Sequence, residues 1–346
     1  TLSAINPAAT DIVGDDIDLG QLPIPRHLPL DGGRYGGTGD AVITRDLDSG
    51  YLNLGAYRMM QQSKNEVGLY LSPGKDARLH ITRAWGIDPL FMLVGSQGFA
   101  KDLSEYEYSG GIKGDPVPVV RGKTTELLLP ANAELVIEGV IRPGQVRAEG
   151  PFGEFPGYYG WPEAGCPLVT VTAVHHRTNP ILTNSQMADY PSCEQSGFFS
   201  IIRSAKIWDD LDKLGVPGIE GVYYHPAAAG GFGMTVISIK QQYAGHAAQA
   251  LALAAQVPGG AYYTKWIIAV DDDVDPTDTD QVIWAMASRC NPSADIDFLR
   301  NTWSTWLDPT QIPPENRPCG SKARINACKE HRHLPVFSKR TTLRKE

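Results

Sequence analysis

The hydrophobic pattern of this 346-residue chain changes its period once, after Pro191. Before that point, short apolar or alternating runs are punctuated by turn residues, a pattern typical of antiparallel strands. After it, apolar residues recur at helical spacing from Phe198 to Leu211, and strand and helix patterns then alternate. The sequence therefore predicts two domains of different class, a β-rich domain followed by an α/β domain.

The β-rich domain is expected to span residues 41–190 and to form an antiparallel sheet closed into a barrel. Strands are predicted at residues 41–44, 51–60, 67–71, 127–129, 135–141 and 168–174, and one helix near residues 77–84. Residues 1–40 are rich in proline, glycine and aspartate. They are interpreted as an extended lead-in, the remnant of an N-terminal domain.

The α/β part begins with a helix that is predicted over residues 191–215 to link the two domains, and Gly215 is well placed to end it. Residues 216–310 are predicted to form the α/β domain, with strands at 234–239 and 266–270 and helices at 243–255 and 281–289. Residues 311–346 are expected to be a return segment and a tail, where nine of the 31 Lys and Arg residues fall.

Two polar or flexible runs in the α/β domain are interpreted as structural. The glycines of Gly230-Gly231-Phe232-Gly233 precede a strand rather than a helix, so they indicate a turn and not a nucleotide-binding loop. The acidic run Asp271-Asp272-Asp273 follows a predicted strand, and a solvated strand end is favoured over a metal site.

Composition limits the classes of function and the location. The net charge of -8 argues against a nucleic-acid binder, because phosphate recognition needs a basic face. Five cysteines, an odd number without a C-x-x-C pair, favour a reducing cytosol. No apolar run approaches the ~18 residues that a membrane helix requires, and the first residues resemble no signal peptide. A cytoplasmic protein that binds neither membrane nor nucleic acid is expected.

The run from Glu149 to Tyr159, EGPFGEFPGYY, is the strongest candidate for chemistry. Glu149 and Glu154 flank two glycines and a proline, residues that shape a loop rather than a helix or strand interior. Two carboxyl groups in one cavity push each other's pKa values apart, which yields a general acid and an ionised partner near neutral pH. A solvated surface turn is the alternative, but the neighbouring Phe152, Phe155, Tyr158 and Tyr159 favour partial burial.

A second candidate is Asn53-Leu54-Gly55-Ala56-Tyr57-Arg58, in a predicted strand. Strand alternation puts Asn53 and Tyr57 on one face and Arg58 on the other, unless a bulge near Gly55 re-aims them. Because the guanidinium fork matches carboxylates, Arg58 is a candidate to bridge Glu149 and Glu154. An exposed arginine on an edge strand is an equally good interpretation of the spacing.

Two further groups are weaker candidates. Asn53, Asp76 and Glu105 offer hard oxygen ligands that suit Mg²⁺, Mn²⁺ or Ca²⁺, although scattered polar residues are more often surface groups. Lys322, in Gly320-Ser321-Lys322, is interpreted as a lysine in a small-residue turn suited to a phosphate. That tripeptide is unspecific, and neither a P-loop nor a G-x-G-x-x-G run occurs in the chain.

Taken in this order, the stretches resemble the UbiD family of reversible decarboxylases, which use prenylated FMN. The resemblance runs from about Ala41 to Ala327 and is most specific at Glu149–Glu154, followed by Gly157-Tyr158, and at Asn53–Arg58. Further matches are Glu105 before residues 108–114, the run 282–292 that ends in Cys-Asn-Pro, and Lys322.

The resemblance implies a mixed α and β fold: a flavin-binding split β-barrel joined by a long helix to a C-terminal α/β domain that drives oligomerisation. It also implies that Arg58, Glu149 and Glu154 form a Glu-Arg-Glu catalytic network. Glu154 is expected to be the acid/base that protonates the carbon left after CO₂ departs. Arg58 and Glu149 are expected to tune it and to help hold the substrate carboxylate.

The cofactor site is likewise implied by the resemblance. Asn53, Asp76 and Glu105 match ligands of a divalent metal, Mn²⁺ or Mg²⁺ with K⁺ nearby, that ties the cofactor phosphate to the protein. The cofactor-binding residues expected from the family are Asn53, Ala56, Tyr57, Arg58 and Lys322, the last as the phosphate contact. Two departures stand out: Asp76 occupies the place where many members have a histidine, and the segment 76–105 is shorter than usual.

The expected function is reversible, non-oxidative decarboxylation of an aromatic or heteroaromatic acid, of phenolic or phenazine type. The expected partners are that acid, CO₂, a flavin prenyltransferase that supplies the cofactor, and further copies of the chain in a homodimer or larger oligomer. The alternatives are an FMN-dependent oxidoreductase or flavin-binding protein on a split barrel, which has no need for Arg58 with two glutamates, and a non-catalytic scaffold.

Overall fold

The computed structural model describes residues 9–45, 50–70, 80–96, 103–160, 164–185, 194–311 and 319–341. The chain divides into two compact units. The first comprises Thr1–Gly153 and Tyr159–Met187, and the second comprises Glu154–Tyr158 and Ala188–Glu346. No helix within the described ranges has the length and apolar character that a membrane crossing requires.

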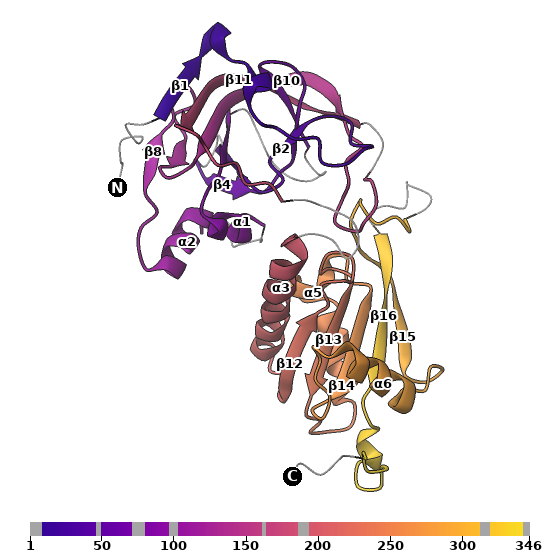
Figure 1. Ribbon diagram of the computed structural model, residues 1–346. Helices are drawn as coiled ribbons and strands as arrows, with labels where there is room; N and C mark the ends of the chain where they lie inside the picture. The colour runs from indigo at the N-terminus through magenta and orange to yellow at the C-terminus, as the bar shows by residue number, and fades with distance from the viewer. Residues whose placement is uncertain are drawn as a thin grey trace. The chain divides into compact units, whose positions relative to one another are not determined.

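The first unit is built on a nine-stranded sheet in which every pairing is antiparallel (Figure 1). Its strands are β1 (Ala9–Val13), β2 (Tyr35–Gly36), β3 (Ala41–Arg45), β4 (Leu52–Gly55), β5 (Met59–Gln61), β6 (Glu66–Leu69), β7 (His80–Trp85), β10 (Leu135–Glu149) and β11 (Ala164–Arg177). The antiparallel sheet is confirmed. Among the described residues, however, the pairings run as an open path from β2 to β4 rather than as a ring, and β1 pairs with β11.

Both faces of this sheet are buried. Along β3, Val42 belongs to one core cluster and Ile43 to another, because successive side chains of a strand point to opposite faces. Ile17 and Leu19 pack on the first face. The other face is covered by helices α1 (Pro89–Gly95) and α2 (Glu105–Lys113) and by a ribbon of β8 (Val119–Arg121) and β9 (Leu128–Pro130).

Three expectations for the first unit are wrong. The helix near residues 77–84 is the strand β7 from His80 onward, because β7 pairs with both β10 and β3, and such distant partners are invisible to local propensity. The single strand at 51–60 is two strands, β4 and β5, separated by Ala56–Arg58. The described part of residues 1–40 is no separate lead-in, since β1 and β2 pair within the sheet and Leu19 is fully buried.

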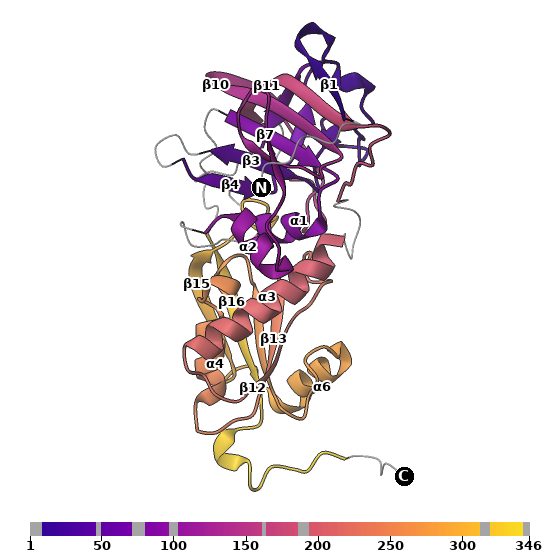
Figure 2. The ribbon, with the colours of Figure 1, turned by 90° about the vertical axis from the view of Figure 1, so that its left-hand side faces the viewer.

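The second unit is an α/β layer structure, as expected (Figure 2). Its elements are α3 (Glu194–Lys213), β12 (Ile219–Tyr224), β13 (Met234–Ile239), α4 (His246–Ala254), α5 (Pro258–Ala261), β14 (Trp266–Asp271), α6 (Thr279–Arg289), β15 (Ile296–Trp303) and β16 (Cys319–Ala327). The strand order is β12-β13-β14-β16-β15, parallel in the middle and antiparallel at both edges. The predicted strands at 234–239 and 266–270 and helices at 243–255 and 281–289 are confirmed within a few residues.

Helices cover both faces of this sheet. Helices α3 and α4 pack with Ile237 and Ile267 on one face, whereas α6 packs with Val236 and Ile268 on the other. The predicted linking helix is α3, and its packing on β12 and α5 makes it part of the second unit. Gly215 adopts φ +76 just beyond its end, as the sequence predicts for a residue that terminates a helix.

One local interpretation in the second unit is wrong and another holds in part. Lys322 lies in β16 rather than in a turn, because that segment pairs with both β14 and β15. Of the acidic run, Asp272 and Asp273 are exposed, as expected of a solvated strand end, but Asp271 is not. It is buried and accepts a 2.7 Å hydrogen bond from Arg289, a residue of α6 that no local pattern connects to it. The turn expected at Gly230–Gly233 is present.

Candidate active site

An ion pair between Arg58 and Glu149 is the centre of the candidate site. Arg58 lies in the break between β4 and β5, and Glu149 is the last residue of β10. Nε of Arg58 donates to Oε1 of Glu149, and Nη2 donates to Oε2, both at 2.9 Å. The two side chains are 8% and 1% exposed. This is the parallel, bidentate geometry that fixes both planar groups in one orientation. The break at Ala56–Arg58 directs the Arg58 side chain toward Glu149. Strand alternation alone did not decide that direction.

Aromatic rings enclose the guanidinium of Arg58. Its central carbon lies 4.0 Å from the ring centroid of Tyr70 and 4.9 Å from that of Phe152. The negative ring faces stabilise the cation, and the rings displace water that would weaken its pairing with Glu149. Phe152 is buried, as expected for the run Glu149–Tyr159, whereas Tyr158 and Tyr159 at its end are exposed.

Tyr35 is a member of the site that sequence reasoning missed. Its hydroxyl hydrogen-bonds the Glu149 carboxylate and accepts the N–H of Gly150 at 3.1 Å. Burial, together with the nearby negative charge of Glu149, raises the pKa of Tyr35 well above its usual value, so the phenol keeps its proton. The sequence carries only a faint signal for it, a lone tyrosine in the glycine-rich run 32–39.

Glu154 is buried and sits at the start of a tight turn. Its N–H donates to the carbonyl of Tyr158, and its own carbonyl accepts from Gly157, which adopts φ +85. The segment Glu154–Tyr158 groups with the second unit, where Phe155 packs 4.6 Å from Phe232. The structure therefore brings Arg58 and Glu149 together within the first unit and assigns Glu154 to the other one.

Asn53 and Glu105 lie at one corner of the first unit. Helix α2 begins with Glu105, capped by Ser104, and Oε2 of Glu105 accepts the N–H of Leu54 at 3.0 Å. Tyr57 hydrogen-bonds Asn53 beside them. Burial raises the pKa of Glu105, and no basic side chain within the described ranges pairs with it.

These residues fit a hard divalent cation. An amide oxygen and a buried carboxylate without a cationic partner among the described residues are the donors that Mn²⁺ or Mg²⁺ prefers, and the ion would offset the cost of burying Glu105. Asp76, the third expected ligand, lies outside the described residues. Within the described ranges no group of three His, Cys, Asp or Glu side chains gathers for a metal.

Ala56 and Lys322 are the remaining cofactor candidates. Ala56 is exposed, and its N–H donates to Gly95. Lys322 is 1% exposed in the second unit, and its ammonium donates to three carbonyls, those of Gly260, Ala261 and Thr264. Burial lowers the pKa of Lys322 to about 7. All three N–H donors are thereby used inside the unit, so a phosphate contact requires that one of these bonds be exchanged.

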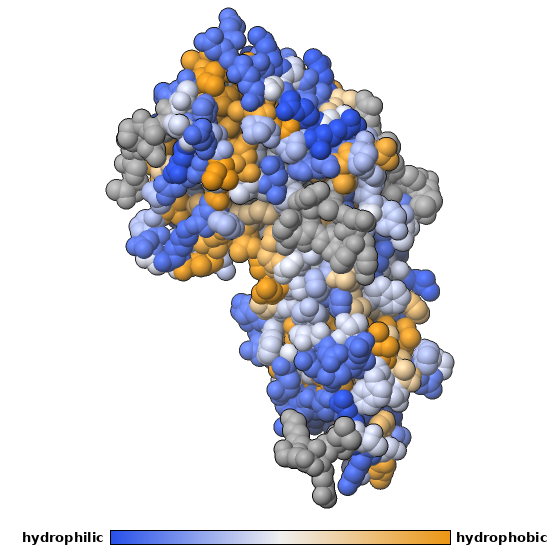
Figure 3. All heavy atoms as spheres, viewed as in Figure 1, coloured by the Kyte–Doolittle hydropathy of each residue, from blue (hydrophilic) through white to orange (hydrophobic). Residues whose placement is uncertain are grey.

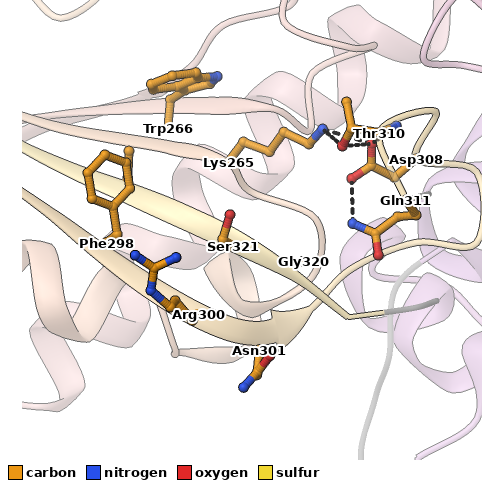
Figure 4. A pocket seen from close by; sticks show the side chains of 11 residues that line it. Lys265, Trp266, Phe298, Arg300, Asn301, Asp308, Thr310, Gln311, Gly320 and Ser321 are labelled. Atoms are coloured by element: carbon orange, nitrogen blue, oxygen red, sulfur yellow. Dashed lines mark hydrogen bonds and ion pairs between the residues drawn. The ribbon is translucent and has the colours of Figure 1, made fainter. Parts of the chain in front are cut away.

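The second unit also has a cavity of about 410 Å³ against β14, β15 and β16 (Figure 4). Lys265 reaches Asp308 and Thr310 at one side, while Trp266, Phe298 and Arg300 lie at the other. Figure 3 shows an apolar area over β15 and β16. Ser321 and Ala323 line the cavity, whereas the intervening Lys322 points to the opposite face of the strand. None of the predicted site residues lines it.

The chain belongs to the UbiD family. Residues 3–189 match the family's 3-octaprenyl-4-hydroxybenzoate carboxy-lyase Rift-related domain, and residues 196–327 match its C-terminal domain. The phenolic acid decarboxylase of Bacillus subtilis is 32% identical over 321 residues, which cover 87% of this chain and 66% of the relative. The chain thus spans about two thirds of the length of the curated relatives it matches.

Solved structures of the family share the fold. The UbiD-class enzyme HmfF from Pelotomaculum thermopropionicum in complex with FMN is 28% identical, with a TM-score of 0.87 over 98% of this chain and 75% of that one. An evolved dimeric form of the same enzyme in complex with prFMN has a TM-score of 0.82 at 29% identity, over 98% and 74%. The open form of vanillic acid decarboxylase from Sedimentibacter hydroxybenzoicus is 30% identical, with a TM-score of 0.82 over 97% and 72%.

Proposed function

We propose that this chain is a reversible, non-oxidative decarboxylase of an aromatic or heteroaromatic acid that uses prenylated FMN. The observation that carries the proposal is the buried bidentate pair of Arg58 and Glu149 at the start of the loop Glu149–Tyr159. A buried ion pair contributes little net stability by itself. The position of this pair at the start of the loop therefore favours a chemical role. Family membership and the names of the relatives support the same reaction.

The reaction breaks the bond between the ring carbon and the carboxylate, releases CO₂ and places a proton on that carbon. Prenylated FMN, when bound, supplies the electron sink for the electron pair of the broken bond. Glu154 is assigned as the acid that delivers the proton and, in the reverse direction, as the base that removes it. Protons return to Glu154 from solvent between turnovers.

Arg58 and Glu149 have a different task, because each already binds the other through two hydrogen bonds. The Tyr35 hydroxyl lies against the same carboxylate, so Glu149 is assigned to orient Arg58 rather than to transfer a proton. The pair therefore provides a fixed dipole that helps to hold the substrate carboxylate and tunes Glu154. Two glutamates in one loop thus take distinct roles.

The cofactor phosphate is proposed to bind through a divalent cation held by Asn53 and Glu105, with Asp76 as a third ligand and K⁺ nearby. The support is the hard-oxygen chemistry of the first two residues and the buried charge of Glu105. Ala56, Tyr57 and Lys322 are proposed to complete the cofactor site. A flavin prenyltransferase is the expected supplier of the cofactor.

The substrate is proposed to be a phenolic or phenazine-type acid. The vanillic acid and phenolic acid decarboxylases among the relatives support a phenolic ring. A cytoplasmic homodimer or larger homo-oligomer is proposed as the working form. The evolved dimeric form of a related enzyme shows that this fold can form a dimer.

The test is reconstitution of the chain with prenylated FMN and Mn²⁺, followed by a panel of phenolic, phenazine, furan and cinnamic acids. CO₂ release and exchange of ¹³C-bicarbonate into the acid are measured, with plain FMN as the matched control. We expect turnover with prenylated FMN and none with plain FMN. Glu154→Gln should lower the turnover rate about 10²–10⁴-fold. Hydride transfer from NAD(P)H without decarboxylation would establish the flavin oxidoreductase alternative, and Glu154→Gln with unchanged activity would remove Glu154 from its role.

A further inference from the structure

The short segment Asp31–Tyr35 holds the loop Glu149–Gly153 along its whole length, within the first unit. Three hydrogen bonds join them: the Gly150 N–H to the Tyr35 hydroxyl at 3.1 Å, the Gly32 N–H to the Pro151 carbonyl at 2.8 Å, and the Gly153 N–H to the Asp31 carboxylate at 3.1 Å. The first bond lies next to Glu149 and the last lies next to Glu154. The ends and the middle of the loop are therefore all fixed by one stretch of chain.

Asp31 is built for this contact. It is 0% exposed, and its second carboxylate oxygen accepts the N–H of Leu28 at 2.8 Å. No lysine or arginine side chain within the described ranges forms an ion pair with the Asp31 carboxylate, so backbone N–H groups stabilise its charge. Burying a carboxylate in this way is costly for stability alone, which favours a role in orienting the loop.

The backbones of the two stretches also approach too closely for other residues. A Cβ atom on Gly32 would lie 2.0 Å from the carbonyl oxygen of Gly150, which is well inside van der Waals contact. Only glycine permits this approach. On the other side, the ring of Tyr35 packs 4.4 Å from that of Phe152, the residue that also flanks Arg58.

We propose that Asp31 and Tyr35 are positioning residues that set the orientation of the Glu149 carboxylate and the direction in which the chain enters Glu154. Tyr35 acts at the first point, since one hydroxyl contacts both the Glu149 carboxylate and the Gly150 N–H. Asp31 acts at the second point through Gly153. The inference rests on the proposed decarboxylase function, because it explains how that function's two glutamates are held in separate roles.

The chemistry of Tyr35 suits this task. A phenol donates one hydrogen bond to the Glu149 carboxylate without adding a second positive charge that would compete with Arg58. Burial and the charge of Glu149 raise its pKa, so the hydroxyl remains a donor through the neutral range. A phenylalanine in its place keeps the ring packing on Phe152 and removes only the two hydrogen bonds.

The kinetic test compares Tyr35→Phe with Tyr224→Phe in the reconstituted holoenzyme. Both tyrosines are 0% exposed, and Tyr224 belongs to a hydroxyl network of the second unit, so the control matches the loss of a buried phenol. We expect Tyr35→Phe to lower kcat about 10- to 100-fold, the range for a hydrogen bond to a charged group, with KM nearly unchanged. The split between kcat and KM is the kinetic readout that a general loss of stability would not produce. Tyr224→Phe should keep both constants near their wild-type values.

The second test needs no activity. Amide hydrogen exchange of the apoprotein is followed by mass spectrometry for the peptide that contains Gly150 and Gly153. We expect exchange there to rise about tenfold or more in Tyr35→Phe and in Asp31→Ala, with Asp31→Asn intermediate because it keeps one acceptor. Tyr224→Phe should leave this peptide protected.

The two tests separate the possible failures. Faster loop exchange together with a lower kcat at nearly unchanged KM supports the inference. Unchanged exchange in both Tyr35→Phe and Asp31→Ala overturns it, even if the wild-type protein decarboxylates its substrate. Equal losses of kcat in Tyr35→Phe and Tyr224→Phe also overturn it, since the effect is then a general loss of stability. A wild-type protein that turns over no acid refutes the proposed function, and the exchange experiment still decides whether Asp31 and Tyr35 hold the loop.

Discussion

Two buried glutamates on the same strand, β10, are held in opposite ways. Glu138 is 0% exposed and accepts hydrogen bonds from backbone N–H groups at Lys123, Thr124 and Thr125, and it contacts His175 at 2.7 Å. Glu149 is held instead by Arg58, from the break between β4 and β5, and by Tyr35, from β2. Because Glu138 is enclosed by backbone N–H groups and by the side chains of its own cluster, we expect it to serve the fold, whereas we expect Glu149, at the start of the loop, to serve the chemistry.

The cluster around Glu138 extends to β1. His175 contacts Asp11 through Nδ1 at 2.6 Å and Glu138 through Nε2, so each ring nitrogen faces a carboxylate. Burial lowers the pKa of His175, but the hydrogen bonds to Glu138 and Asp11 raise it more, with a net shift upward. Burial raises the pKa of Glu138, but hydrogen bonds from His175 and Thr125 lower it further than that. The imidazolium therefore ties β1 to β10 across β11.

The largest expected effect is on Glu138. Glu138→Gln leaves a buried imidazolium short of one charge partner and replaces one carboxylate oxygen that accepts from backbone N–H groups by an amide that cannot accept, so we expect the free energy of unfolding to fall by about 3–5 kcal/mol. The measurement is urea unfolding followed by fluorescence. Decarboxylation per folded molecule should remain near the wild-type value. A large loss of turnover in protein that is still folded would show that the two glutamates are not separable.

The matched substitution Glu149→Gln should have the opposite profile. It removes the anion that fixes Arg58, and we expect turnover to fall about 100-fold or more, within the range seen when one preorganised charge contact is lost. The thermal midpoint should fall less than in Glu138→Gln, because Arg58 keeps its contacts with Tyr70 and Phe152. Turnover close to wild type would contradict the assignment of Arg58 and Glu149 to catalysis.

The pH dependence of stability should report the His175 cluster. Its folded-state pKa is raised, so its contribution is fully present below the unfolded value of about 6.5 and is lost as pH rises through the folded value. The lowered pKa values of Glu138 and Asp11 act at the other end, where stability is lost as pH falls through their folded values. We expect the thermal midpoint to decline from mildly acidic toward alkaline pH, and His175→Gln to abolish that decline. An identical alkaline decline in both proteins would rule out His175 as its source.

The smallest effect is expected at the rim of the same cluster. Lys123 pairs with Asp11 but is half exposed, so the pair is screened by water and salt. Lys123→Met should change the free energy of unfolding by less than about 1 kcal/mol, and less still in high salt. A loss of unfolding free energy as large as that of Glu138→Gln would mean that the cluster depends on the exposed charge of Lys123 rather than on the buried charges of Glu138 and His175.

Much of the fold was accessible from the sequence because it rests on local patterns. The change of period after Pro191, the strands from Ala41 onward and the helix that ends before Gly215 all follow from spacing and turn residues. Strand β7 was missed, because its identity depends on pairing with β3 and β10 rather than on its own residues. Lys322 was placed in a turn for the same reason, since the partners of β16 are distant in sequence.

The same distinction, between local sequence patterns and contacts of distant residues, applies to the candidate site. By itself the sequence determined the chemical types at the site, two carboxylates in a glycine-proline loop, one arginine and a set of hard oxygen ligands, because residue identity and spacing carry that information. Only the tertiary structure decided that Arg58 binds Glu149 with both arms, that Tyr35 hydrogen-bonds the same carboxylate, and that Asp31 holds Gly153. These contacts join residues about 90 to 120 positions apart, and no local pattern records which distant groups a folded chain brings to 2.9–3.1 Å.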